Sequence, residues 1–155
     1  MVEVGSKAPE FCLYSSEKVK ISLSDFKGEN VLLLFFPLAF TGTCTKELCG
    51  VRDNISRYNS SDAQVLAISV DSVYTLARYK EDQNLNFLLL SDFNKIVSHL
   101  YGSLYPVFGF DMTGVSKRSA FVINRDGAIL YAEVLENASE IPDFEAIHKI
   151  LSKCN

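Results

Sequence analysis

The sequence contains no apolar run close to the roughly 18 to 20 residues that a membrane-spanning helix requires. Its first ten residues include Glu3, Lys7 and Pro9 and form no apolar stretch, so we expect no secretory signal. The chain also lacks a basic run or stripe, and its net charge is −4. These absences predict a cytoplasmic protein whose partners include neither a membrane nor nucleic acid.

Histidine is scarce as well, since the chain has only His99 and His148. Both lie far along the chain from Cys44 and Cys49, and neither forms a spacing typical of zinc sites. A cysteine hydrolase needs a histidine within reach of its thiol, so the sequence disfavours that class too. The Cys-x-x-Cys motif of general disulfide oxidoreductases is also missing. We therefore expect neither a metal site nor a thioredoxin-type redox motif.

The overall composition is that of one globular domain spanning residues 1–155. Hydrophobic residues make up 48% of the chain and charged residues 22%, values typical of chains that bury a core. Cysteine occurs at four positions, namely Cys12, Cys44, Cys49 and Cys154. A reducing compartment does not maintain a permanent disulfide framework, so any working cysteine pair is expected to be transient and catalytic.

Strand-like and helix-like segments alternate along the chain. Strands are predicted at residues 31–36, 64–70, 87–90, 119–123 and 128–133, with an N-terminal hairpin within residues 11–23. Helices are predicted at residues 43–58, 71–83, 91–101 and 142–151, and residues 103–115 are predicted to form a loop. This order predicts an α/β fold with a mixed central sheet flanked by helices. It is the thioredoxin-like order, with an N-terminal extension and an inserted strand and helix.

Cys44 follows a predicted buried strand and a loop, and it lies in the first turn of the predicted helix. A cysteine is nucleophilic only as the thiolate, and the free N–H groups and dipole of a helix N-terminus favour an anion there. Thr41 carries a hydroxyl that both donates and accepts, which suits a peroxide held against the sulfur. Gly42 allows close approach of the backbone, and Pro37 ends the strand. The loop therefore has the features of a thiolate site.

The pattern Pro37-x-x-x-Thr41-x-x-Cys44 resembles the signature of the peroxiredoxin family, and the similarity extends from residue 5 to residue 127. The resemblance implies that Cys44 is the peroxidatic cysteine, that Thr41 orients the peroxide and that Pro37 shields the sulfur. It also implies that Arg118, just before a predicted strand, supports the thiolate and polarises the peroxide. The thiolate would attack one peroxide oxygen and become a sulfenic acid.

Further substrate contacts are expected around this loop. The full predicted set comprises Phe40, Thr41, Thr43, Cys44, Glu47 and Arg118. Glu47 occupies a position where the family often has an acid that orients the site, although a solvated first-turn acid favoured by the helix dipole is an equal alternative. Phe40 and the aromatic residues of segment 101–110 line the peroxide pocket, cover a dimer contact or belong to the core.

Cys49 is the candidate resolving cysteine. On an ideal helix it lies about 140° around the axis from Cys44 and about 7.5 Å along it, too far for a disulfide without backbone movement. If this pair bridges, the first helical turns must unwind. The spacing resembles the bacterioferritin-comigratory (PrxQ) peroxiredoxins, in which the second cysteine resolves, whereas the preceding loop resembles the alkyl hydroperoxidase E subfamily. A buried helix-face residue is the alternative for Cys49.

The remaining two cysteines are assigned no catalytic part. Cys154 lacks the Val-Cys-Pro setting of the family's C-terminal resolving cysteines, and Cys12 is expected to pack in an N-terminal strand.

The resemblance implies a thiol-dependent peroxidase that reduces hydrogen peroxide and organic hydroperoxides. It implies recycling by thioredoxin or a similar dithiol protein, a monomer or homodimer, and no cofactor, since sulfur carries the electrons. A peroxide-sensing redox switch with little turnover is the alternative function. Steady peroxide consumption with a thiol reductant distinguishes the enzyme from the switch.

Overall fold

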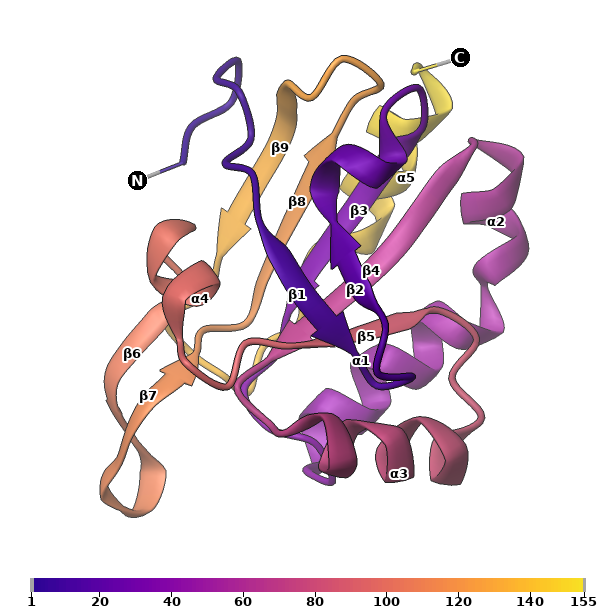
Figure 1. Ribbon diagram of the computed structural model, residues 1–155. Helices are drawn as coiled ribbons and strands as arrows, with labels where there is room; N and C mark the ends of the chain where they lie inside the picture. The colour runs from indigo at the N-terminus through magenta and orange to yellow at the C-terminus, as the bar shows by residue number, and fades with distance from the viewer. Residues whose placement is uncertain (1, 155) are drawn as a thin grey trace.

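A seven-stranded mixed sheet runs through the centre of the molecule in the computed structural model, which describes residues 2–154 (Figure 1). The strand order is β2-β1-β5-β4-β3-β8-β9, and a separate two-stranded sheet pairs β6 with β7. Strands β3, β4 and β5 are parallel to one another, and the other neighbours pair antiparallel. The strands are β1 (Cys12–Ser15), β2 (Lys20–Ser22), β3 (Asn30–Phe35), β4 (Ala63–Ser69), β5 (Leu88–Ser91), β6 (Leu104–Phe108), β7 (Met112–Ser116), β8 (Ser119–Ile123) and β9 (Ile129–Val134).

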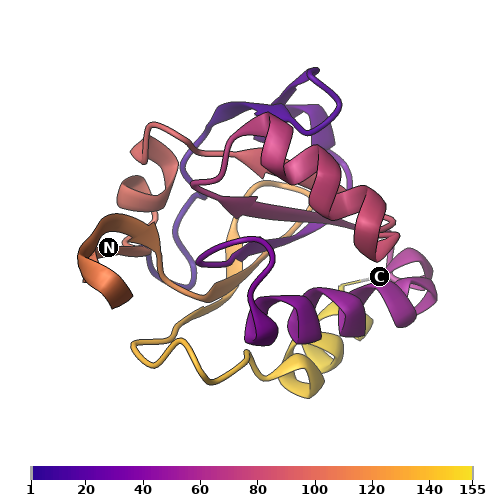
Figure 2. The same cartoon turned by 90° about the horizontal axis from the view of Figure 1, so that it is seen from below.

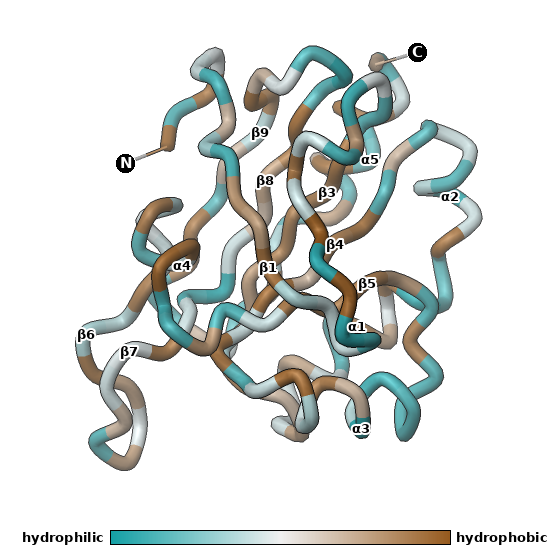
Figure 3. Tube along the Cα trace, in the orientation of Figure 1, coloured by the Kyte–Doolittle hydropathy of each residue, from teal (hydrophilic) through white to brown (hydrophobic). Residues whose placement is uncertain are grey.

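Helices cover both faces of this sheet. They are α1 (Gly42–Asp53), α2 (Ile55–Ser60), α3 (Val73–Gln83), α4 (Ile96–Leu100) and α5 (Phe144–Ser152), with short 3-10 turns at Leu23–Phe26 and Gly109–Asp111. Seen from below, α1, α3 and α5 gather on one side of the sheet (Figure 2). Hydrophobic residues concentrate in the central strands, whereas the connecting loops are mostly hydrophilic (Figure 3). Within residues 2–154, no helix combines the length and the apolar character needed to cross a bilayer.

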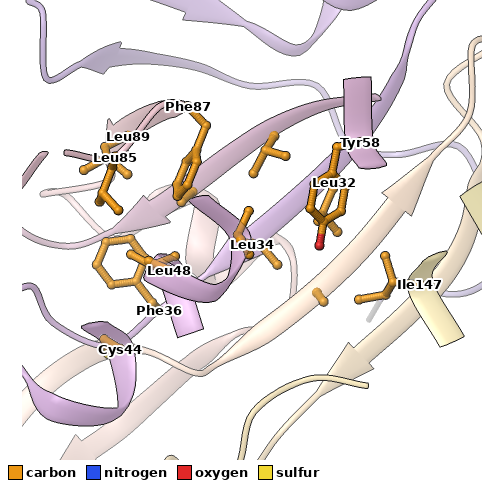
Figure 4. Packing of buried hydrophobic residues seen from close by; sticks show 14 of the residues in the cluster. Leu32, Leu34, Phe36, Cys44, Leu48, Tyr58, Leu85, Phe87, Leu89 and Ile147 are labelled. Carbon is orange, nitrogen blue, oxygen red and sulfur yellow. The ribbon is translucent and has the colours of Figure 1, made fainter. Parts of the chain in front are cut away.

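The central strand β3 is buried on both faces, which explains its continuous apolar sequence. Leu32 and Leu34 point into a cluster shared with α1, α2, α3 and α5. Leu33 and Phe35 alternate to the opposite face, where they pack with α4 and the N-terminal segment. Figure 4 shows the first cluster, with Cys44 at its edge. Cys44, the candidate nucleophile, therefore packs against the main hydrophobic core.

The predicted α/β fold with a mixed, thioredoxin-like sheet is confirmed, and three helix boundaries differ from the sequence prediction. The helix predicted at 43–58 breaks at Asn54, whose side chain donates to Gly50 O at 2.8 Å, so that α2 starts anew. The helix predicted at 91–101 forms only from Ile96, because both Asp92 carboxylate oxygens accept from backbone N–H groups, at 3.1 Å from Val97 and 2.6 Å from Ser98. The last helix begins after its Asp143 cap rather than at 142.

The predicted loop at 103–115 is wrong, because these residues form the β6–β7 hairpin. Its turn places Phe110 and Asp111 at positive φ, a conformation that the sequence does not predict. The segment was predicted to be a loop because it contains residues typical of loops, namely Pro106, Gly109 and Gly114. A two-stranded ribbon tolerates proline because one edge of each strand needs no ladder partner.

Candidate active site

The loop between β3 and α1 holds Cys44 in the first turn of α1. Thr41 is the N-cap residue in extended conformation, and its Oγ1 donates to Leu38 O at 2.7 Å. That bond consumes the hydroxyl hydrogen and leaves the lone pairs of the oxygen available as acceptors. The Cys44 side chain is 1% exposed and packs with Phe36 and Leu48, yet it also lines a cavity. The sulfur therefore lies between the core and a solvent-connected pocket.

Arg118 reaches Cys44 across the sheet. The antiparallel register pairs Ser119 of β8 with Phe35 of β3, which brings the preceding Arg118 beside the loop that follows β3. Its Nη2 lies 3.4 Å from Cys44 Sγ. The guanidinium also donates to Ala138 O from Nε at 3.1 Å and from Nη2 at 2.8 Å. These bonds fix the orientation of a cation that is 1% exposed.

Glu47 occupies the other side of this guanidinium. Arg118 Nη1 donates to Glu47 Oε1 at 2.8 Å, whereas Glu47 Oε2 has no hydrogen-bond partner within residues 2–154. Burial raises the pKa of Glu47 from 4.5 to about 7, and Arg118 only partly offsets this effect. The structure excludes the solvent-exposed alternative for Glu47, which is 2% exposed. Glu47 therefore contacts Arg118 and does not line the cavity at Cys44.

The cavity beside the sulfur has a volume of about 210 Å³. It is lined by Pro37, Thr41, Gly42, Thr43, Cys44, Phe108, Arg118, Ala138 and Ser139. Five predicted site residues are therefore together here, whereas Phe40 and Glu47 are not among its lining residues. Ala138 and Ser139, which no sequence motif indicated, follow the sheet in an irregular loop. Phe108, from the aromatic segment 101–110, lines the cavity, which agrees with the pocket alternative for this residue.

A larger hollow of about 620 Å³ lies elsewhere, between β1, α4 and the N-terminus of α3. Its lining includes Cys12 and is mostly apolar, with no lysine, arginine or histidine. A thiolate there would have no cationic partner, so the smaller cavity at Cys44 is the better candidate for thiol chemistry. Cys12 was expected to pack in its strand, but it is exposed on β1.

Helix α3 supplies contacts to α1 that the sequence did not predict. Tyr79 OH and Thr45 Oγ1 are 2.9 Å apart, and the Tyr79 ring lies 5.0 Å from that of Phe40. Burial raises the pKa of Tyr79 to about 12, so this phenol stays protonated. Cys49 is half-buried, and its Sγ donates to Gln83 Oε1 at 3.5 Å. Phe40 and Cys49 thus face α3 rather than the cavity.

All four cysteines are free thiols in this structure. Cys44 and Cys49 both lie within the continuous helix α1, so the geometry assumed from the sequence holds and their side chains leave the helix in different directions. Cys154 donates to Ile150 O at 3.1 Å, in α5. Among the described residues, no group of three or more histidine, cysteine, aspartate or glutamate side chains is placed to hold a metal ion.

Comparisons with known proteins agree with this geometry. Residues 4–132 match the AhpC/TSA family. The chain is 42% identical over 130 residues to a putative peroxiredoxin bcp of Coxiella burnetii, covering 83% of this chain and 85% of that protein. It is 38% identical over 146 residues to alkyl hydroperoxide reductase E of Mycobacterium bovis, covering 92% of each. The crystal structure of peroxidoxin BcpB from Mycobacterium tuberculosis superposes with a TM-score of 0.88 at 26% identity, covering 100% of this chain and 99% of that one. A match over most of the chain, and relatives well above 30% identity, place this protein in the AhpC/TSA family as a peroxiredoxin.

Proposed function

We propose that Cys44 is the peroxidatic cysteine of this thiol peroxidase, that Cys49 resolves its sulfenic acid, and that a dithiol protein such as thioredoxin recycles the enzyme. The observation that carries the first part is the 3.4 Å contact between Arg118 Nη2 and Cys44 Sγ at the wall of a small cavity. A fixed guanidinium beside a sulfur stabilises the thiolate, which is the form that attacks.

The oxidation step moves charge from sulfur to oxygen. The Cys44 thiolate attacks one peroxide oxygen, an S–O bond forms, and the O–O bond breaks. The departing oxygen takes the bonding electron pair and leaves as hydroxide or alkoxide, which is then protonated. Thr41 Oγ1 already donates to Leu38 O, so it accepts from the peroxide O–H. Arg118 and the N–H groups of the first turn of α1 stabilise the developing negative charge.

The resolving step joins the two sulfurs. The Cys49 thiol attacks the sulfenic acid on Cys44, which forms a disulfide and releases water. Because both residues belong to α1, this step requires residues 44–49 to leave the helix. The oxidised form is therefore expected to have a locally unwound α1, and hydrogen exchange is expected to be faster at residues 42–52 than in the reduced form. Equal protection in both forms would contradict this step.

A peroxidase assay with thioredoxin tests the proposal on three proteins. Cys44→Ser should consume no hydrogen peroxide. Cys49→Ser should undergo the first oxidation at the wild-type rate but lose turnover with thioredoxin. Retained activity in Cys44→Ser would overturn the assignment of the nucleophile. Undiminished turnover in Cys49→Ser would remove Cys49 from the cycle, and one oxidation per chain in the wild type would favour a peroxide-sensing switch.

A further inference from the structure

The face of α1 that carries Cys49 is attached to α3. Thr45, Cys49 and Arg52 follow one another at spacings of four and three residues, so they share one side of the helix. On α3, Tyr79 and Gln83 are also four residues apart and face this stripe. Cys44 lies off the stripe and points to Arg118. The two thiols are thus held by partners in different parts of the fold.

Gln83 makes two contacts to α1. Its side-chain oxygen accepts from Cys49 Sγ at 3.5 Å, and its backbone oxygen accepts from Arg52 Nη1 at 2.6 Å. Gln83 is the last residue of α3, where carbonyl groups lack partners within the helix. Asn86 Nδ2 adds a bond to Arg52 O at 3.2 Å. Arg52 therefore anchors α1 beyond Cys49, and the segment from Cys44 to Cys49 can unwind while the anchor remains.

We propose that Gln83 is a positioning residue that holds the Cys49 thiol against α3 and thereby limits the rate of disulfide formation. This inference rests on the proposed resolving role of Cys49. The Cys49–Gln83 contact exists only while α1 is wound, and it must break before the Cys49 sulfur reaches Cys44. An interaction present before the step and absent during it slows that step by the free energy it contributes.

The same contact affects which of two reactions the Cys44 sulfenic acid undergoes, disulfide formation with Cys49 or further oxidation by peroxide. While Cys49 is held, the sulfenic acid meets further peroxide, which transfers one oxygen to sulfur, leaves as water or alcohol, and produces a sulfinic acid. A slower disulfide step gives a larger sulfinic fraction at a given peroxide concentration. Gln83 therefore affects the sensitivity of the enzyme to overoxidation without contacting the peroxide.

The test uses two substitutions that remove the acceptor oxygen, Gln83→Leu and Gln83→Ala. Quenched-flow alkylation followed by mass spectrometry measures separately the oxidation of Cys44 and the formation of the disulfide. Both variants should form the disulfide about two- to fivefold faster, the range expected for losing one weak hydrogen bond, and should accumulate less sulfinic acid. The rate of Cys44 oxidation should stay at the wild-type value, a split that a general loss of structure would not produce. Glu81→Leu, at an exposed position on the same turn, is the matched control and should match the wild type in both steps.

Disulfide formation at or below the wild-type rate in both Gln83 variants, with normal Cys44 oxidation, would overturn the inference. The failure of the proposed function has a different signature. If one equivalent of hydrogen peroxide produces no Cys44–Cys49 disulfide in the wild-type chain, the resolving role of Cys49 is wrong. If that disulfide forms in the wild type and forms at the same rate in the Gln83 variants, only the positioning role of Gln83 is wrong.

Discussion

Replacing Glu47 by glutamine should remove a pH dependence that the buried site imposes on stability. Burial raises the Glu47 pKa from 4.5 to about 7, although Arg118 lowers it. Between these two values the folded chain binds a proton that the unfolded chain has released. The free energy of unfolding contributed by this group is therefore greatest below pH 4.5, falls as the pH rises from 4.5 to about 7, and is constant above that.

The size of the effect follows from the pKa change. A rise from 4.5 to about 7 corresponds to about 3 kcal/mol, since one pKa unit is worth about 1.4 kcal/mol. Glutamine keeps an acceptor oxygen for Arg118 Nη1 but does not titrate near neutral pH. Above the Glu47 pKa the substitution also removes a negative charge beside the buried Arg118, so the observable is the pH dependence of the difference between the two proteins rather than its absolute value.

Urea denaturation monitored by circular dichroism from pH 5 to pH 8 provides the measurement. The stability of the wild type relative to Glu47→Gln should fall by about 2 to 3 kcal/mol across this range, most of it below pH 7. Glu145→Gln is the control, because Glu145 belongs to an exposed ion pair with Arg57 and its loss should change the profile by less than about 1 kcal/mol. Parallel wild-type and Glu47→Gln profiles, or a relative gain for the wild type with rising pH, would refute the argument that burial outweighs Arg118.

Three further substitutions test the site and its support. Arg118→Lys should slow Cys44 oxidation about 100-fold in stopped-flow assays, because a single lysine nitrogen cannot replace the three guanidinium nitrogens that contact Ala138 O, Glu47 Oε1 and the sulfur, and a rate within threefold of wild type would contradict this role. Thr41→Val keeps the shape but removes the acceptor oxygen, and it should lower kcat/KM for hydrogen peroxide by about 10-fold or more; an unchanged value would remove Thr41 from substrate binding. Leu48→Ala should destabilise the chain by about 2 to 5 kcal/mol in urea denaturation, since Leu48 is fully buried beside Cys44, and a loss under 1 kcal/mol would mean that the core refills the space.

Local periodicity allowed much of this fold to be predicted. The apolar run of β3 and the alternation in β4 predicted buried strands because strand periodicity depends on residues close in sequence. The helix predicted at 71–83 forms as α3, where the hydroxyl of the N-cap residue Ser72 accepts from Thr75 N at 3.1 Å. The β6–β7 hairpin and the break at Asn54 were not predicted, because side-chain bonds and turn conformations overrode the local pattern there.

The place of Cys44 at a helix N-terminus beside Thr41 could be predicted from the residues alone, because strand, loop and helix follow one another directly in the chain. The groups that surround that sulfur come from distant parts of the chain and depend on how the strands pair. The pairing of β8 with β3 carries Arg118 to within 3.4 Å of a residue 74 positions earlier, and the Ala138 carbonyl then fixes its orientation. Such contacts depend on which strands become neighbours, and that choice involves segments far apart in the chain rather than one local pattern of side chains.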